Sequence, residues 1–171
     1  MALPRRHSIK RTRLEDASIE NGLSFSWSNA TYDYTAGHTL LAVQNDSLTH
    51  NLHIDQIWCH GDTTTQVIVH GTSENGFTMA GTPVTGVNLN RVGTPATASA
   101  TAFGNESGNT QGHIFWAGSI PADNATPVAI GLGIILGVDD GGGVSGGVIA
   151  VDYVDVGGEA LVTIIGHYEN A

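Results

Sequence analysis

Short runs in which apolar and polar residues alternate follow one another along most of the chain, separated by clusters of Gly, Pro, Asn, Asp and Ser. Alternation with a period of two is typical of a β-strand that buries one face in a core. Strands are predicted over 23–28, 39–45, 52–60, 65–71, 84–90, 98–103, 113–118, 128–136, 148–156 and 160–168. Such strands, with turns between them, indicate an all-β fold: a single β-sandwich or jelly roll of about 8–10 short antiparallel strands.

The alternation also predicts which side chains share a face of a strand. In the run 52–59 we expect one face to hold Leu52, Ile54, Gln56 and Trp58, and the other to hold His53, Asp55, Ile57 and Cys59. Trp58 and Trp116 are expected in the core. Cys59 is the single cysteine, so it cannot form an internal disulfide, and we expect a buried, inert thiol.

Positive charge is confined almost entirely to the start of the chain. Five of the six Lys and Arg residues lie in the first thirteen positions, namely Arg5, Arg6, Lys10, Arg11 and Arg13. Residues 14–171 hold only Arg91 against all sixteen acids, a formal balance of 1 − 16 = −15. Since Asn21-Gly22 is a strong turn signal, we divide the chain into an extended basic N-terminal arm, 1–22, and a β-sandwich domain, 23–171.

The arm has three interpretations: a solvated tail, a nucleic-acid tether, or an arm that anchors the protein to another protein subunit. An acidic domain repels a polyanion, so a nucleic-acid partner is not expected. About twenty extended residues span roughly 65–70 Å, enough to cross a neighbouring subunit. We therefore favour protein anchoring and assign it to the five basic residues named above.

Two glycine-rich segments resemble catalytic or nucleotide-binding motifs but lack their context. The segment 143–147 fits G-x-S-x-G, yet the nucleophile of a hydrolase needs a strand before it and a helix after it, whereas a β-branched run follows here. The segment 131–137 has one residue too many for a dinucleotide loop, and no helix follows it. We interpret its glycines as strand positions close to a neighbouring backbone. No catalytic residue is predicted, and the protein is not expected to be an enzyme.

Histidines and acids raise the alternative of a metal site. His50, His53, His60 and His70 lie near one another in sequence, but a cupin-type site needs two histidines two residues apart and a glutamate soon after. Asp139-Asp140, Asp152 and Asp155 offer oxygen ligands for calcium, and solvated acidic loops are the simpler interpretation. No metal and no other cofactor is predicted.

Nothing in the sequence favours a membrane location. The longest apolar run, 128–136, is far shorter than the ~20 residues of a membrane-spanning helix. No apolar stretch follows the N-terminal charges, as it would in a secretory signal. We therefore expect neither a membrane span nor export.

Three segments of the sandwich resemble the small jelly-roll auxiliary proteins of tailed-phage virions, the capsid decoration (cement) and head-fibre class. They are Val87-Asn88-Leu89-Asn90-Arg91 with the Thr/Ala/Ser-rich run after it, 131–137, and the closing strand 160–169. The resemblance covers residues 40–170. It implies a homotrimer on the outer surface of the virion capsid, bound to the major capsid protein.

Two other functions remain open beside that of a decoration protein. One is a head-fibre or tail domain that binds a receptor or glycan, in which exposed loops such as 104–112 carry recognition. A sugar-binding surface built from Tyr32 and Tyr34 is a separate alternative. The other is a cupin-like metalloenzyme.

Overall fold

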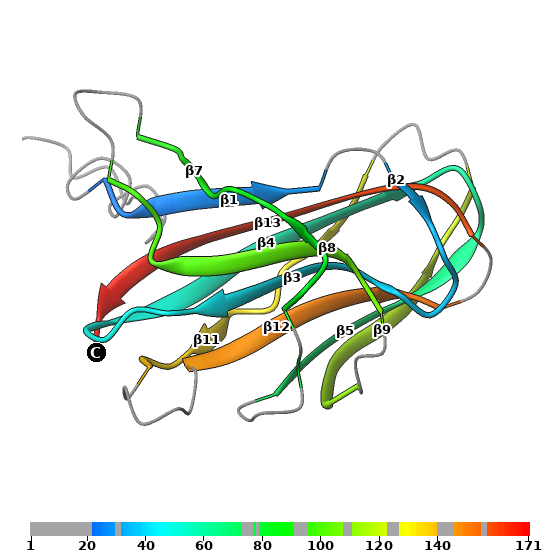
Figure 1. The fold of residues 1–171 in the computed structure, drawn as a ribbon. Coiled ribbons are helices and arrows are strands. Elements are labelled where there is room, and N and C mark those ends of the chain that lie inside the picture. The colour runs from blue at the N-terminus through cyan, green and yellow to red at the C-terminus, as the bar shows by residue number, and fades with distance from the viewer. Residues whose placement is uncertain are drawn as a thin grey trace, which may run out of the picture.

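All elements of the described part of the chain are β-strands, as the sequence predicts (Figure 1). The structure is a computed structural model and describes residues 22–29, 32–72, 77, 79–90, 96–107, 111–122, 127–139, 146–154 and 157–171. No helix occurs within these ranges. The predicted arm lies outside the described residues, apart from Gly22.

The strands form two antiparallel sheets that face each other (Figure 1). The first sheet contains β1 (Ser24–Ser28), β2 (Tyr32–Tyr34), β4 (His50–Gly61), β7 (Val87–Asn88), β10 (Val128–Ile130), β11 (Ile134–Leu136) and β13 (Gly158–Asn170). Its order is β10-β4-β13-β1-β7, with β11 beside β4 and β2 beside β13. The second sheet contains β3 (Thr39–Asn45), β5 (Thr65–Thr72), β6 (Thr82–Pro83), β8 (Ala100–Glu106), β9 (His113–Ile120) and β12 (Gly146–Tyr153). Its order is β6-β8-β3-β12-β5-β9.

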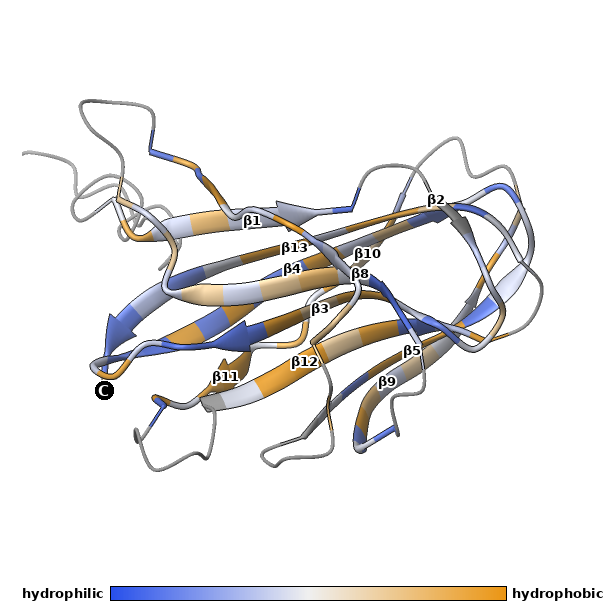
Figure 2. Ribbon diagram, in the orientation of Figure 1, coloured by the Kyte–Doolittle hydropathy of each residue, from blue (hydrophilic) through white to orange (hydrophobic). Residues whose placement is uncertain are grey.

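Apolar side chains from both sheets meet in one core cluster between them. Apolar positions recur along the strands that line this core (Figure 2). The largest fully buried side chains include Trp27, Tyr153, Phe25, Leu52, Ile57, Ile149 and Ile164. The β-sandwich is thus built as its alternating pattern predicts.

The second sheet also buries part of its outer face. Ala42 of β3 joins Val148 and Ala150 of β12 in a small separate cluster, against which Phe77 and Met79 pack. Strand β3 is consequently buried on both faces, which explains why Leu40 to Val43 is a continuous apolar run.

The face assignment of β4 changes at a β-bulge. Its pairing with β13 passes from Ile165↔Gln56 to Gly166↔Ile54, so Asp55 is the extra residue. Before the bulge Leu52 and Ile54 face the core; after it, Ile57 and Cys59 do. The prediction that Gln56 and Trp58 share the face of Leu52 is therefore wrong. Gln56 is exposed, and Trp58 is half-buried outside the core cluster.

Glycine lets the two strands approach at this bulge. A Cβ atom on Gly166 would lie 2.4 Å from the carbonyl oxygen of His53, a backbone atom of the neighbouring strand. Any larger residue would have to push β4 and β13 apart.

Other boundaries also differ from the prediction. The expected strand 84–90 is replaced by β6 and β7, which belong to different sheets, and β2 was not expected. The expected strand 128–136 is broken between β10 and β11, where Gly133 has φ 59°. A Cβ on Gly131 or Gly133 would meet nothing within 4 Å, so close packing is the wrong explanation for these glycines. Gly146, within the G-x-S-x-G segment, begins strand β12, so no helix follows the serine.

Candidate functional site

The residues that the sequence assigns to anchoring lie outside the described part of the chain. Arg5, Arg6, Lys10, Arg11 and Arg13 all belong to the arm, so the structure does not place them. The candidate surfaces below are therefore those of the sandwich itself.

The described part of the sandwich contains no lysine or arginine. Among the described residues, its carboxylates therefore accept hydrogen bonds from neutral groups or from histidine. Glu106, which is buried, accepts from the backbone N–H groups of Ala80 and Gly81, both at 2.7 Å. Asp46 accepts from the hydroxyl of Thr101 at 2.6 Å. These two carboxylates are thus held by backbone N–H groups and a hydroxyl group.

Strand β9 forms one edge of the second sheet and carries exposed apolar side chains. Ile114 is 55% exposed and Phe115 is 44% exposed. The pairing with β5 shifts between Val69↔Trp116 and His70↔Ile114, so Phe115 is the extra residue of a bulge. Two consecutive large apolar residues are thus exposed at this bulge. An edge of this kind, with no charged Lys or Glu side chain along it, is suited to contact with another protein surface.

A shallow hollow lies on the outer face of the first sheet. It has a volume of about 360 Å³ and is lined by Trp58, His60, Pro127, Leu161 and Thr163. Trp58 comes to this face because the bulge at Asp55 shifts the alternation of β4. The predicted sugar-binding pair is not found here, since Tyr34 is buried in the core at 4% exposure, and the side chain of Tyr32 is outside the described part.

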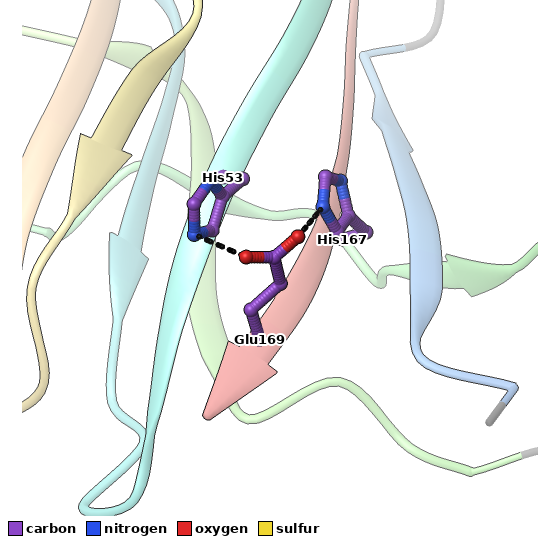
Figure 3. A group of neighbouring side chains, drawn as sticks. All are labelled: His53, His167 and Glu169. Atoms are coloured by element: carbon purple, nitrogen blue, oxygen red, sulfur yellow. Dashed lines mark hydrogen bonds and ion pairs between the residues drawn. The ribbon is translucent and has the colours of Figure 1, made fainter. Parts of the chain in front are cut away.

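Two histidines and a glutamate gather near the end of β13 (Figure 3). His53 projects from β4, whereas His167 and Glu169 project from β13. The carboxylate of Glu169 lies between the two rings. His53 Nε2 is 3.5 Å from Glu169 Oε2, and His167 Nε2 is 3.1 Å from Glu169 Oε1. The two imidazole rings stack, with centroids 5.1 Å apart and planes at 23°.

Asp55 orients His167 from the other side. The Nδ1–H of His167 donates to Asp55 Oδ2 at 2.7 Å, while its Nε2–H donates to Glu169. Burial of the ring favours the neutral form, but the hydrogen bonds and negative charges of Asp55 and Glu169 outweigh it and raise the pKa of His167 above its ordinary value. The His167 side chain is 1% exposed, against 14% for His53 and 40% for Glu169. One side of the cluster is therefore open to solvent at Glu169.

His70 belongs to a different, closed arrangement on the second sheet. Its Nδ1 accepts from the backbone N–H of Gly112 at 3.3 Å, so its Nε2–H donates to Asp152 Oδ2 at 2.9 Å. The hydroxyl of Thr39 donates to the other oxygen of Asp152 at 2.6 Å. Both ring nitrogens of His70 are used, so this pair holds the segment at 111–112 against the sheet and has no atom left for a substrate. Asp152, an expected calcium ligand in one interpretation, is 5% exposed and fully engaged here.

Cys59 is buried, as expected. Burial raises the pKa of its thiol to about 12, and a hydrogen bond with Tyr153 opposes this only in part. The thiol is therefore unreactive at neutral pH.

Of the four histidines grouped by sequence, the described structure brings only His53 into the cluster with Glu169. Its partner His167 lies on the last strand, far away in the chain, and was not proposed. The pattern His167-Tyr168-Glu169 could have indicated that His167 and Glu169 lie together, since residues two apart on a strand share a face. The pairing of β13 with β4 could not be read from the sequence.

Searches against protein-family models, curated proteins and solved structures gave no match. No helix among the described residues has the length and apolar character needed to cross a membrane.

Proposed function

We propose that the protein is a virion structural protein, a capsid decoration (cement) protein that binds the major capsid protein on the outer surface of the shell as a homotrimer. The observation that carries the proposal is the edge strand β9, which leaves Ile114 and Phe115 exposed next to each other. Apolar side chains on an uncharged sheet edge favour association with another chain. In an assembly, a neighbouring chain would cover such an edge.

The strand pairing supports a jelly roll, the fold common to viral capsid domains and lectins. A jelly roll has eight strands in two Greek keys, and it pairs its first strand with its last, its second with the next-to-last, and so on inward. Here β1 pairs with β13, β3 with β12, β4 with β10 and β11, and β5 with β9. Strands β6, β7 and β8 then form an insertion between β5 and β9.

Charge supports the anchoring role of the arm. The arm carries five basic residues, whereas the described part of the sandwich carries none. Opposite charge on two surfaces fixes their register and speeds their encounter. The arm of one copy is thus attracted to acidic surfaces of neighbouring subunits.

The experiment that tests this function is co-sedimentation with capsid shells. A variant lacking residues 1–20 is expected to keep the β-sheet circular dichroism of the full chain and to lose attachment. Replacing Arg5, Arg6, Arg11 and Arg13 together by Glu is expected to weaken attachment most strongly at low salt. Full decoration by the truncated protein would contradict the anchoring role.

A head-fibre or tail domain that binds a glycan is the second candidate. The hollow beside Trp58 supports it, because an accessible aromatic ring next to His60 and Thr163 provides an apolar surface with polar groups at its rim. In this case Trp58→Ala would abolish binding on a glycan array without affecting attachment to capsids. A cupin-like enzyme has less support, because His53 and His167 lie on the outer face of a sheet and not between the sheets.

A further inference from the structure

We propose that His53, His167 and Glu169 bind one divalent transition-metal ion of the Zn²⁺ class, with Asp55 as the carboxylate that orients His167. The site lies on the outer face of the first sheet, across the pairing of β4 with β13 (Figure 3). The inference does not depend on the proposed role in a virion.

The spacing of the donor atoms fits a single small ion. One ligand atom from each of the three residues lies within 4.8 Å of the others, and the two pairs with Glu169 are 3.1 and 3.5 Å apart. Zinc binds nitrogen and carboxylate oxygen at about 2.0–2.2 Å in a tetrahedron, which places neighbouring ligand atoms roughly 3.3–3.6 Å apart. The three donor atoms are therefore close enough for one ion to bind between them once the two stacked imidazole rings turn toward it.

Asp55 supplies an independent reason to read the cluster as a metal site. A histidine that binds a metal through one ring nitrogen almost always donates its other N–H to a carboxylate or carbonyl, which fixes the ring and strengthens it as a ligand. His167 has this arrangement: Nδ1 faces Asp55 at 2.7 Å, and Nε2 faces the cluster. Metal binding would replace the proton on Nε2 and leave the hydrogen bond to Asp55 intact.

The backbone is built around this arrangement. Asp55 is directed toward His167 because it is the bulged residue of β4. Gly166 permits the close approach of the two strands immediately beside His167 and His53. The bulge of β4 and the close approach of β4 and β13 thus both occur at the cluster itself.

The donor set selects the class of metal. Two imidazole nitrogens and one carboxylate suit Zn²⁺ and neighbouring first-row ions, whereas Ca²⁺ and Mg²⁺ prefer oxygen ligands alone. Three protein ligands leave a fourth position, and Glu169 is 40% exposed on that side. The fourth position is therefore open to water or to a ligand from another molecule.

The test is a titration of untagged, full-length, chelator-treated protein with ZnCl₂, followed by calorimetry, with metal analysis after gel filtration. We expect one Zn²⁺ per chain and a rise in Tm at saturating zinc. Asp55→Asn is expected to weaken binding 10–100-fold, and His53→Gln and Glu169→Gln to weaken it further. With Co²⁺ in place of zinc, the visible spectrum should show no thiolate band, since Cys59 is not a ligand.

The matched control is His113→Gln, which removes an exposed histidine of β9 and should leave the affinity unchanged. Glu169 is the most exposed of the three ligands, so Glu169→Gln serves as the second variant if His53→Gln does not fold. The proposal is overturned if the wild type binds no stoichiometric zinc. It is also overturned if zinc binds Glu169→Gln as tightly as the wild type, because surface histidines would then be the ligands.

Discussion

Individual carboxylates in the sandwich are held by histidines, hydroxyls and backbone amides, because the described part of the chain has no lysine or arginine. A buried carboxylate that accepts from buried donors is costly to remove, because those donors are then left without an acceptor. Asp152 is the clearest case. It accepts from Thr39 and His70, and the His70 side chain is not exposed at all.

Asp152→Ala is expected to lower the free energy of unfolding by about 3 kcal/mol, because it leaves the Nε2–H of His70 buried without an acceptor. Urea denaturation followed by tryptophan fluorescence measures this change. The control Glu159→Ala removes an exposed carboxylate and should change stability by no more than about 0.5 kcal/mol. Equal effects of the two substitutions would contradict the structural role of Asp152.

Cys59 gives a prediction about alkaline pH. Its thiol has a pKa of about 12 in the folded protein, against an ordinary value of 9.0. Above pH 9 the unfolded chain loses this proton and the folded chain keeps it, so the thiol destabilises the fold as pH rises from 9 to 12. The free energy of unfolding falls by up to about 1.4 kcal/mol per pH unit within this range.

The measurement for Cys59 is urea denaturation at several pH values for wild type and Cys59→Ala. The free energy of unfolding of the wild type minus that of Cys59→Ala should fall with rising pH in this window. The tyrosines titrate in both proteins, so their contribution cancels in this difference. A difference that is constant from pH 8 to pH 11 would show that Cys59 ionises as easily in the folded protein as in the unfolded chain.

Among the strands, the bulge at Asp55 has the widest effect. It reverses the alternation of β4, so that Leu52 and Ile57 both face the core although one has an even number and the other an odd one. It also brings Trp58 to the outer face and Asp55 to His167. One extra residue therefore determines both the hollow and the histidine cluster.

Gly166→Ala should be clearly destabilising, by about 1–3 kcal/mol or more, because the new methyl group would meet the carbonyl oxygen of His53. Gly137→Ala is the matched control, since a Cβ there meets nothing within 4 Å. It should be neutral or stabilising by up to about 1 kcal/mol. Thermal unfolding of the two variants compares them directly, and a Tm for Gly166→Ala equal to that of wild type would contradict the close approach.

Much of the fold could be predicted from the sequence because alternation follows from burial of one face. The alternating run predicted as a strand at 65–71 forms β5, and its Val67 and Val69 face the core. The bulge could not be predicted, since Asp55 continues the alternating pattern and only the pairing with β13 reveals the extra residue. The contact between His53 and His167 could not be predicted for the same reason. It depends on the register between two strands that are far apart in the sequence, and the sequence alone did not reveal that register.

The molecule as a whole combines an acidic sandwich with an exposed apolar edge. Ile114 and Phe115 lie on that edge, at the opposite side of the second sheet from β6. Association through β9 would cover both side chains and pair the free edge of the strand.

Ile114→Lys is expected to reduce self-association, because a charge on a sheet edge disfavours pairing with another strand. Sedimentation velocity over a range of protein concentrations measures the oligomer. Leu48→Lys is the control, since Leu48 is 66% exposed in the turn between β3 and β4, away from that edge. If Ile114→Lys forms the same oligomer as wild type, the β9 edge is not the contact between copies.

The absence of lysine from the described sandwich has a practical consequence for following the arm. Lys10 is the only lysine of the chain, so an amine-directed acylating reagent modifies the arm and the terminal amine alone. Trypsin can cut only within the first thirteen residues and after Arg91. Protection of Lys10 from acylation would therefore report docking of the arm in an intact assembly, with no engineered label.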